Sequence, residues 1–437
     1  MIKTYDVKSA QETILKRNYN HLLEYPENLI KSTEKLFGIG VSPDKAVDII
    51  LRSVRENGDR AIAEWTKLLD GINITDIRIS AELIENAYRS LSPSLLDVFK
   101  LSASRIKLFH EQQPLPNWET TTLGGILGQR TTPIERVGVY VPGGTAPLPS
   151  SLLMSVIPAQ VAGVNQIIIC TPPNPDKSIL AAAAICNIKD VFLAGGAQAV
   201  AAMAYGTKTI PKVDKIVGAG NLYVTLAKQK VYGTVGIEGL AGPTETMVIA
   251  DKTANPAWVA SDLLAQAEHD YLASAILLTP DADIARTVAA EIDNQLAKLS
   301  RSEMIETSLQ NRGGIVLTPD LRSAAMLADD YGPEHLCLSV EKPEEVAGWI
   351  NNAGGIFFGE NSYEVLGDYM AGPSHIMPTG GTARFSSPLN VLDFVKISSV
   401  ISLDPETSLE LSPPAAKFAQ TESLTGHAAA ANYRIKQ

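Results

Sequence analysis

Short runs rich in valine and isoleucine alternate with alanine-rich segments through much of this 437-residue chain. Each run ends near glycine or proline, which is typical of buried strands followed by tight loops. Such alternation favours mostly parallel sheets covered by helices on both faces. The first block contains GVYVPGG, NQIIICTPP, DVFLAGG and DKIVGAG, and the second contains ASAILLTPD, GGIVLTPD, HLCLSV and GGIFFG. Two blocks of similar rhythm predict an α/β fold with two Rossmann-like domains and a cleft between them.

The two ends of the chain have a different pattern. Roughly the first 130 residues are mostly helical in character, with Ser42-Pro43 and Ser92-Pro93 as helix starts. His110 lies near the end of the second of these helices, where we expect a packing role. The last 45 or so residues are predicted to form short helical pieces.

Composition excludes several classes of protein. The net charge of −11 argues against a nucleic-acid binder and a polybasic membrane anchor. Cys170, Cys186 and Cys337 show no paired spacing, which excludes a disulfide scaffold and favours a reducing cytosol. The uncharged stretch 137–175 contains seven prolines and four glycines, so no membrane-spanning helix is expected there. The amino terminus has no apolar core of a signal peptide.

Glycine-rich strand ends mark a candidate nucleotide site. Gly218-Ala219-Gly220 follows the run DKIV but lacks the third glycine of the dinucleotide fingerprint, and a simple tight turn is the competing interpretation. Gly195-Gly196-Ala197-Gln198 ends another run and opens a helix whose amino terminus suits a phosphate or a ribose.

A metal site is indicated by scattered oxygen and nitrogen ligands. Gln266 and His269 are three residues apart in helical sequence and would share one face, although a solvated polar face explains them equally well. Asp368 lies in a predicted loop, and His427 follows a glycine near the carboxyl terminus. Imidazole and oxygen ligands together would suit zinc with room for a substrate.

Glu334-His335 is the candidate acid/base pair. It follows Tyr331-Gly332-Pro333, and a Gly-Pro turn would direct both side chains into one cleft. A surface pair is the competing interpretation. Cys337 alternates with leucines in an apolar strand and is expected to be buried and inert. His375, in the loop Gly372-Pro373-Ser374-His375, is a candidate neighbour without an assigned role.

Taken in order, these signals match one known family. The stretches that carry the match are ERVGVYVPGG, FLAGGAQA, VGAGNLYV, GLAGPTETMVIAD, LLAQAEHD, YGPEHL, GDYMAGPSHIMPTGGTARFSS and ESLTGHAA. The sequence resembles histidinol dehydrogenase over essentially its whole length. The resemblance implies a cytoplasmic homodimer with one Zn²⁺ per subunit. Such an enzyme oxidises L-histidinol to L-histidine via L-histidinal with two NAD⁺, the last step of histidine biosynthesis. It also implies two incomplete Rossmann-like domains with parallel sheets, which explains the failed fingerprint.

Residue roles follow from the resemblance, position by position. It assigns NAD binding to Tyr140, Gln198 and Asn221, and zinc binding to Gln266, His269, Asp368 and His427. Glu334 and His335 match the catalytic pair. Substrate contacts are implied for Thr244, Gln266, His269, His335, Asp368, Glu422 and His427. The family's carboxyl-terminal tail crosses to the partner subunit, so Glu422 and His427 would complete the neighbour's site.

Domain bounds are predicted from the same comparison. They are a helical segment 1–31, a catalytic domain 32–137 with 248–391, an NAD-binding domain 138–247 and a dimerisation tail 392–437.

The sequence departs from the family pattern at a few positions. Glu238-Gly239 stands where many members have Asp-Met, Ser374 where asparagine is common, and Thr244 where serine is frequent. These departures affect substrate preference more than chemistry. A paralogue oxidising another small alcohol, such as a sulfonated diol, is therefore the main alternative. A zinc hydrolase that uses Glu334 to activate water and a catalytically silent binding protein are the others.

Overall fold

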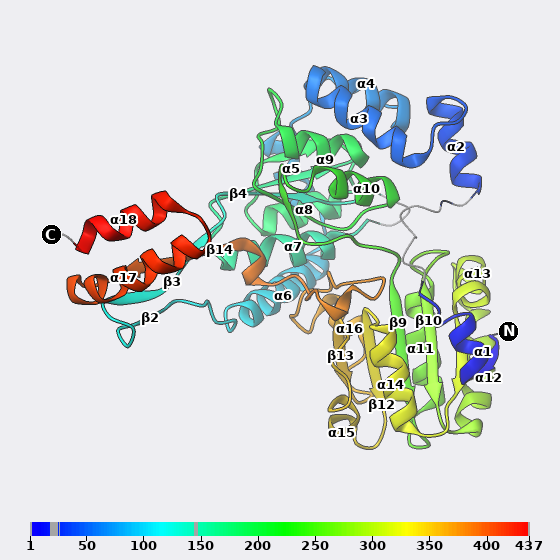
Figure 1. The fold of residues 1–437 in the computed structure, drawn as a ribbon. Coiled ribbons are helices and arrows are strands. Elements are labelled where there is room, and N and C mark those ends of the chain that lie inside the picture. Colours follow the sequence, from blue (N-terminus) through cyan, green and yellow to red (C-terminus); the bar gives the residue numbers. More distant parts are fainter. Residues whose placement is uncertain (1, 18–24, 26, 144–146, 436–437) are drawn as a thin grey trace. The chain divides into compact units, whose positions relative to one another are not determined.

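The computed structural model describes residues 2–17, 25, 27–143 and 147–435 (Figure 1). They form two compact units, the first built from residues 1–112 and 135–394 and the second from residues 113–134 and 395–437. The first unit holds two parallel sheets, and the second holds one antiparallel sheet. His21, for which a structural role was expected, lies outside the described residues.

The first parallel sheet has the strand order β6-β5-β4-β7-β8. The chain starts at the central β4, winds outward through β5 and β6, and returns to add β7 and β8 on the other side, which is a doubly wound arrangement. The strands are β4 (Arg136–Tyr140), β5 (Gln166–Thr171), β6 (Val191–Leu193), β7 (Lys215–Val217) and β8 (Gly236–Ile237). The four runs of the first predicted block coincide with β4 to β7.

The second parallel sheet has the order β1-β11-β10-β9-β12-β13 and is wound in the same way around β9. Its strands are β1 (Thr4–Asp6), β9 (Glu245–Ala250), β10 (Ser274–Thr279), β11 (Gly314–Leu317), β12 (His335–Ser339) and β13 (Gly355–Phe358). Two doubly wound parallel sheets confirm the predicted α/β fold class. The amino-terminal segment is not purely helical as predicted, because β1 pairs with β11 as an edge strand.

Alternation along each strand divides the core between the two faces of the second sheet. Val248 and Ala250 of β9 pack in one cluster, whereas Met247 and Ile249 pack in another. Successive side chains of a strand point to opposite faces, so a strand with both faces covered is apolar throughout. This explains why the predicted runs are continuously hydrophobic rather than alternating.

Helices cover these sheets and begin where the sequence predicted. The side chain of Ser42 caps the helix that starts at Pro43, and Ser92 caps the helix that starts at Pro93. The helices described in the first unit are α1 (Val7–Glu12), α2 (Glu27–Phe37), α3 (Pro43–Asn57), α4 (Asp59–Asp70), α5 (Ala81–Ser90), α6 (Pro93–His110), α7 (Pro149–Val161), α8 (Lys177–Ile185), α9 (Gly196–Tyr205), α10 (Leu222–Val231), α11 (Pro256–Ala267), α12 (Ala282–Leu296), α13 (Ser302–Arg312), α14 (Leu321–Tyr331), α15 (Pro343–Ala347) and α16 (Glu364–Tyr369), with short 3₁₀ turns at η1 (Thr382–Arg384) and η2 (Val391–Phe394). His110 is buried at the end of α6, with Nδ1 2.8 Å from the carbonyl oxygen of Ile106.

The predicted domain bounds stay a prediction. The packing shows in addition which sheet the amino-terminal helices cover. Ile50 and Ile62, on α3 and α4, share a buried cluster with Ile168 and Phe192 of the first sheet. The helices of this amino-terminal region therefore help to cover the sheet of β4 to β8.

The second unit contains a three-stranded antiparallel sheet of order β14-β3-β2 and two helices. Its elements are β2 (Trp118–Thr120), β3 (Ile126–Pro133), β14 (Val395–Ser402), α17 (Pro405–Thr421) and α18 (Thr425–Ile435). The prediction of helical pieces alone was wrong for residues 395–402, and the strands at 118–133 were not predicted. Here β14 pairs with β3 along its whole length, and this long-range pairing determines the conformation.

Two composition-based expectations can be checked directly. Cys170, Cys186 and Cys337 are free and buried. In the part of the chain that the structure describes, no helix is long and apolar enough to span a membrane.

Candidate active site

The predicted acid/base pair lies at the amino edge of the second sheet, where β9 and β12 begin. Glu334 directly precedes β12, and His335 is its first residue. The register pairs His335 with Thr246, so Glu334 lies beside Glu245 of β9. The chain enters β12 through a sharp turn, since Gly332 ends α14 with a left-handed backbone (φ 57°).

Thr244 connects Glu334 with Gln266. Its Oγ1 lies 2.7 Å from Oε2 of Glu334 and 3.1 Å from Oε1 of Gln266. The backbone N–H of Glu245 donates a hydrogen bond of 3.1 Å to the same oxygen of Glu334. Gln266 is buried in the last turn of α11, which ends at this edge because it runs back against the strands that it connects.

His335 lies between two carboxylates. Its Nδ1 is 3.7 Å from Oε2 of Glu334, and its Nε2 is 3.8 Å from Oδ1 of Asp368. Both separations exceed hydrogen-bond length. The two ring nitrogens are buried and have no hydrogen-bond partner among the described residues. Asp368, on α16, also contacts Gln266, with 3.4 Å between Oδ2 and Nε2. Unpartnered nitrogens in a buried site are positioned for a ligand rather than for packing.

Burial dominates the electrostatics of this cluster. It raises the pKa of Glu334 well above its ordinary value, against the hydrogen bonds from Thr244 and Glu245. It raises the pKa of Asp368 to about 6 and lowers the pKa of His335 to about 3. His335 is therefore neutral near pH 7. A neutral imidazole beside a buried carboxyl group with a raised pKa provides two groups suited to acid/base chemistry.

His269 lies beyond the helix on which it was expected. Helix α11 ends at Ala267, and the chain then turns into β10, with the side chain of Asp270 accepting the N–H of Leu272. The prediction that His269 is part of this helix was therefore wrong, because the chain reverses direction here to enter β10. A positive charge on His269 nevertheless lowers the pKa of His335, which places the two rings in the same electrostatic neighbourhood.

His375, left unassigned by the sequence, contacts the backbone of Asp368. Its Nδ1 lies 2.9 Å from the carbonyl oxygen of Asp368, and its Nε2 lies 3.3 Å from Oγ of Ser151. Burial lowers its pKa to about 4. His375 thus joins the end of α16 to the start of α7.

The predicted metal ligands are divided between the two units. Gln266, His269 and Asp368 belong to the first unit, whereas His427 is an exposed residue of α18 in the second. Glu422, the predicted substrate contact, is exposed at the end of α17. Among the described residues, no group of three or more His, Cys, Asp or Glu side chains is arranged to hold a metal. Glutamine, one of the predicted ligands, is outside that set of residue types.

The predicted cofactor residues lie at the carboxyl edge of the first sheet. Tyr140 ends β4, and its hydroxyl accepts the N–H of Gly196 at 3.1 Å. Gln198 is buried in the first turn of α9, and its Oε1 has no hydrogen-bond partner among the described residues. Asn221 caps α10 and is itself exposed. In doubly wound sheets, ligands bind at this edge where the strand order reverses, which here is between β4 and β7.

Gly218 occupies that reversal point and requires glycine. Its φ is +112°, and a Cβ would lie 2.1 Å from the carbonyl oxygen of Tyr140. The peptide groups on both sides of Gly218 are held by a buried ion pair between Lys228 and Glu238, which the sequence analysis missed. Glu238 accepts the N–H of Gly218 at 2.7 Å, and Lys228 donates to its carbonyl oxygen at 3.2 Å and to Glu238 at 2.7 Å.

Glu364 is another residue that the sequence analysis missed. It is fully buried, its Oε1 accepts from Oγ1 of Thr246 and from Sγ of Cys337, and burial raises its pKa to about 8. It lies one helical turn before Asp368, and this spacing was the signal that would have placed both carboxyls on one face.

Burial also raises the pKa of Cys337 far above its ordinary value, so the thiol stays protonated and inert as predicted.

Comparisons with known proteins show the family to which the chain belongs. A family model described as histidinol dehydrogenase matches residues 41–435. The histidinol dehydrogenase of Halalkalibacterium halodurans is 48% identical over 396 residues, which cover 90% of this chain and 93% of that protein. That of Aquifex aeolicus is 48% identical over 393 residues, which cover 90% and 92%. A crystal structure of histidinol dehydrogenase from Elizabethkingia anophelis superposes with a TM-score of 0.91 at 35% identity and covers 100% of this chain and 98% of that one. The chain therefore belongs to the histidinol dehydrogenase family.

Proposed function

We propose that this enzyme oxidises L-histidinol to L-histidine through L-histidinal, the last step of histidine biosynthesis, with two NAD⁺ and one Zn²⁺ per subunit. The observation that carries the proposal is the meeting of Glu334, His335 and Asp368 at one sheet edge in a chain of this family. The conversion of an alcohol to an acid removes four electrons. It therefore requires two hydride transfers, for which NAD⁺ supplies the acceptor.

The division of proton transfer follows from the two electrostatic environments. His335 is neutral and has unpartnered nitrogens, so it accepts the carbinol proton as the first hydride leaves the substrate. The aldehyde then adds water. Glu334 accepts one proton of that water while the protonated His335 returns its proton to the carbonyl oxygen, which gives the gem-diol and leaves His335 neutral. His335 accepts a proton again when the second hydride leaves. Thr244 and the N–H of Glu245 orient the Glu334 carboxylate for its step.

The number of hydrogen atoms available for hydrogen bonds around Gln266 supports a bound cation at this site. The hydroxyl of Thr244 has one hydrogen, so it cannot donate both to Glu334 and to the amide oxygen of Gln266. The oxygen and nitrogen of an amide exchange places when the group is turned by 180°. In the turned orientation Gln266 donates to Thr244, Thr244 donates to Glu334, and the amide oxygen lies 3.4 Å from the Asp368 carboxylate. A cation stabilises two such facing oxygens.

We therefore propose Gln266, His269 and Asp368 as zinc ligands of one subunit, completed by His427 of a second copy. A zinc ion bound by these residues would supply Lewis acidity and a binding point for the amine and imidazole of the substrate. The buried cluster of raised-pKa carboxyls and neutral imidazoles fits such a cation, because a positive charge favours the ionised carboxylates.

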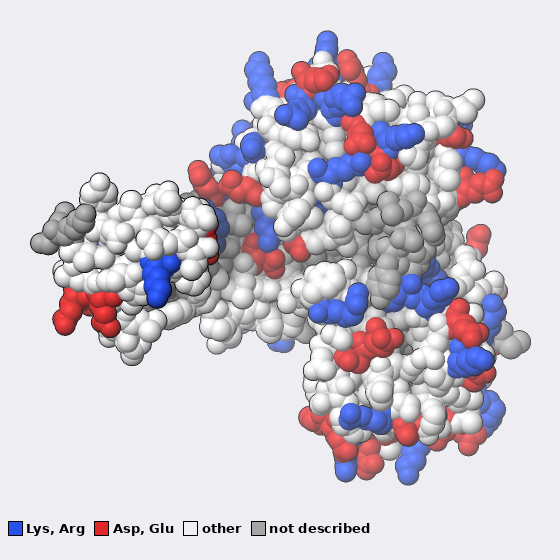
Figure 2. Space-filling view, in the orientation of Figure 1, with Lys and Arg blue, Asp and Glu red and all other residues white. Residues whose placement is uncertain are grey.

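The second unit supports the proposed homodimer. Its described residues include exposed apolar side chains, among them Leu409 (49% exposed), Ile401 (71%) and Phe418 (68%). On the face shown in Figure 2, the part formed by α17 and α18 carries few charged side chains. Burial of such a surface against a second copy is favourable. In that assembly Glu422 and His427 would reach the partner's site, where a carboxylate suits the cationic substrate.

For the cofactor we propose Tyr140, Gln198 and Asn221 at the carboxyl edge of the first sheet. The buried, unpartnered Oε1 of Gln198 is an acceptor available for a nucleotide hydroxyl.

We also propose a cytoplasmic location, since three free buried thiols suit a reducing compartment.

An endpoint assay tests the proposed reaction. Purified protein is mixed with Zn²⁺, excess NAD⁺ and a limiting amount of L-histidinol, and NADH absorbance is followed to completion. We expect two NADH per L-histidinol and L-histidine as the product. One NADH per substrate would contradict the four-electron reaction. No NADH from L-histidinol, with turnover of another alcohol such as a sulfonated diol, would establish the paralogue instead.

A further inference from the structure

The proposed mechanism gives no role to Arg17, a cation that is largely buried. Arg17 lies after α1 in the amino-terminal segment, outside the residues matched by the family model, and its side chain is 12% exposed. Its guanidinium forms a two-point ion pair with the carboxylate of Glu245, with Nη2 2.9 Å from Oε2 and Nη1 bonded to Oε1. The side chain of Glu245 is itself only 7% exposed.

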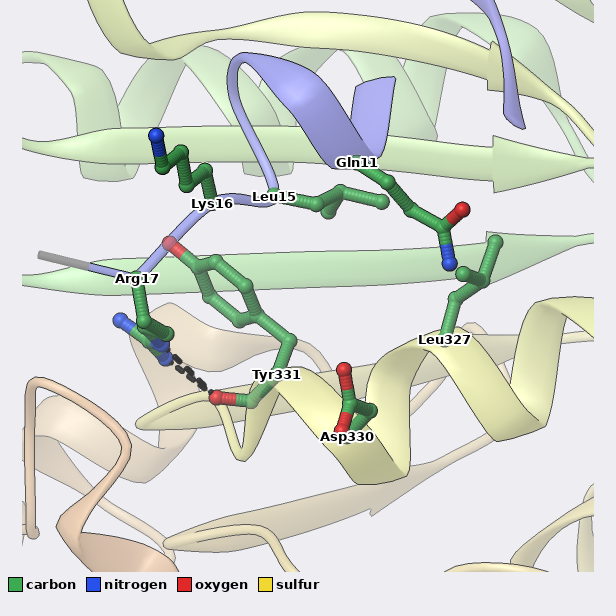
Figure 3. A pocket seen from close by; sticks show the side chains of 7 residues that line it. All are labelled: Gln11, Leu15, Lys16, Arg17, Leu327, Asp330 and Tyr331. Carbon is green, nitrogen blue, oxygen red and sulfur yellow. Dashed lines mark hydrogen bonds between the residues drawn. The ribbon is translucent and has the colours of Figure 1, made fainter. Parts of the chain in front are cut away.

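The same guanidinium holds the turn that leads into β12. Nε and Nη2 of Arg17 donate to the carbonyl oxygen of Tyr331 at 2.9 and 2.6 Å, and Nη2 is 3.3 Å from the carbonyl oxygen of Gly332. Cζ lies 3.4 Å above the ring of Tyr331. Figure 3 shows Arg17 reaching from its segment to the end of α14 at Tyr331.

These contacts join the two backbone segments that position the acid/base pair. Glu245 supplies the N–H that binds the Glu334 carboxylate, and Gly332 is two residues before Glu334. The segments come from β9 and from the end of α14, far apart in the chain. The planar guanidinium of Arg17 bonds both segments. It therefore restrains the distance between the Glu334 carboxylate and the backbone N–H of Glu245 that donates to it.

We propose that Arg17 is a positioning residue that aligns Glu334 and His335 for proton transfer. The proposal rests on the catalytic roles given above to that pair. Arginine is required because its planar fork donates in several directions at once, whereas lysine presents a point charge and cannot bond both carbonyls and the carboxylate in this geometry. Displacement of a catalytic group by about 1 Å can lower the rate about 100-fold.

Kinetics of Arg17 variants test the proposal at saturating L-histidinol and NAD⁺. We expect Arg17→Ala to lower kcat about 10- to 100-fold with small changes in both KM values, because binding residues stay in place. Arg17→Lys should recover only part of the loss. Lys16→Ala is the matched control, since Lys16 is the exposed sequence neighbour of Arg17 and both residues line one cavity. Unchanged kcat in Arg17→Ala would overturn the proposal.

Chemical rescue separates positioning from a general loss of structure. Arg17 lines a cavity of about 240 Å³ together with Leu15, Leu327 and Tyr331. Millimolar guanidinium chloride should restore part of kcat in Arg17→Ala, whereas sodium chloride at equal ionic strength should not. Absence of rescue in a folded Arg17→Ala protein, together with a changed KM for L-histidinol, would show a binding role instead and overturn the proposal.

Removal of Arg17 alone leaves the buried Glu245 carboxylate unpaired, which can prevent folding. The double variant Arg17→Met with Glu245→Gln removes both charges and keeps the backbone N–H of residue 245. We expect this variant to fold and to retain the loss in kcat. A folded double variant with wild-type kcat would overturn the proposal.

Hydrogen exchange provides a readout that does not depend on the reaction. In Arg17→Ala or the double variant, amide exchange measured by mass spectrometry should increase in peptides covering 331–337 and 244–247. The Lys16→Ala protein should exchange like the wild type. If the wild type fails to oxidise L-histidinol, the proposed function fails alone, and increased exchange still establishes the Arg17 contact. Unchanged exchange in those peptides would overturn the positioning role whatever the substrate.

Discussion

Thr244 and Glu334, ninety residues apart in the chain, meet at the amino edge of the second sheet with 2.7 Å between Oγ1 and Oε2. Parallel pairing of β9 with β12 brings the two segments side by side. The contact gives a buried carboxyl group a fixed orientation. Burial raises its pKa at the same time, which makes the ionised form of this carboxyl group a stronger proton acceptor.

Glu334→Gln should separate the two oxidation steps. We expect the aldehyde step to fall about 100- to 10,000-fold because the amide cannot accept the proton of water, while alcohol oxidation changes little. Rapid-quench or stopped-flow measurement with L-histidinol and with L-histidinal gives both rates. Glu341→Gln, an exposed residue shortly after β12, is the control. Equal losses in both steps would refute this division of roles.

Asp368→Ala should reduce zinc binding. Loss of one carboxylate ligand removes charge and one coordination position, so we expect the zinc content per chain to fall after dialysis against a weak chelator. Inductively coupled plasma mass spectrometry measures the content. Asp330→Ala, at an exposed position of α14, should keep wild-type occupancy. Full zinc occupancy in Asp368→Ala would remove Asp368 from the ligand set.

Mixing two variants that each fail to form L-histidine tests whether the tail acts in the partner. His427→Asn alone should lose zinc and activity, and Glu334→Gln alone should not form L-histidine. In a mixed dimer, the site with intact Glu334 receives His427 from the other subunit. Refolding an equal mixture should therefore restore about a quarter of the wild-type activity, since half of the dimers are mixed and each has one complete site. No recovery would place His427 in its own subunit's site or outside the site.

Gly218→Ala should weaken NAD⁺ binding. The added methyl would lie 2.1 Å from the carbonyl oxygen of Tyr140 at a φ of +112°, so the backbone at the carboxyl edge must shift. We expect the Kd for NAD⁺, measured by calorimetry, to rise about 10-fold or more, because phosphate and ribose contacts depend on this edge. A Cβ added at Gly239 would have no neighbour within 4 Å, so the Gly239→Ala protein should bind NAD⁺ as the wild type does. An unchanged Kd in Gly218→Ala would exclude this edge as the cofactor site.

Glu364→Gln should change how stability depends on pH. The folded protein holds a proton on Glu364 up to a pKa of about 8, whereas the unfolded chain releases it near pH 4.3. The stability contributed by this group is therefore complete below the unfolded pKa and is lost as pH rises through about 8. Each unit of pKa difference corresponds to about 1.4 kcal/mol.

Urea unfolding of the metal-free protein at several pH values checks this expectation. Glu364→Gln should lose less unfolding free energy than the wild type between about pH 5 and about pH 8. The exposed Glu344→Gln serves as the control, with the wild-type slope. Identical slopes for Glu364→Gln and the wild type would mean that Glu364 is ionised in the fold.

Local sequence pattern determined much of this protein. Continuous apolar runs such as residues 166–171 predicted strands covered on both faces, and Ser42 and Ser92 predicted helix starts that the structure confirms. Adjacent Glu334 and His335 marked the acid/base pair. Continuous apolar runs, helix caps and neighbouring polar residues depend on interactions within a few positions of the chain, so they can be recognised in the sequence alone.

Tertiary structure alone decided the rest. The turn that separates His269 from α11, the pairing of β14 with β3 and the bond of Arg17 to Glu245 have no local signature. Each depends on segments brought together by sheet order, where the gain from long-range pairing or ion pairing outweighs local propensity. The sequence therefore indicated Glu334 and His335 as the proposed acid/base pair, whereas the fold determined that this pair meets Asp368 at the amino edge of the second sheet and which residues hold it there.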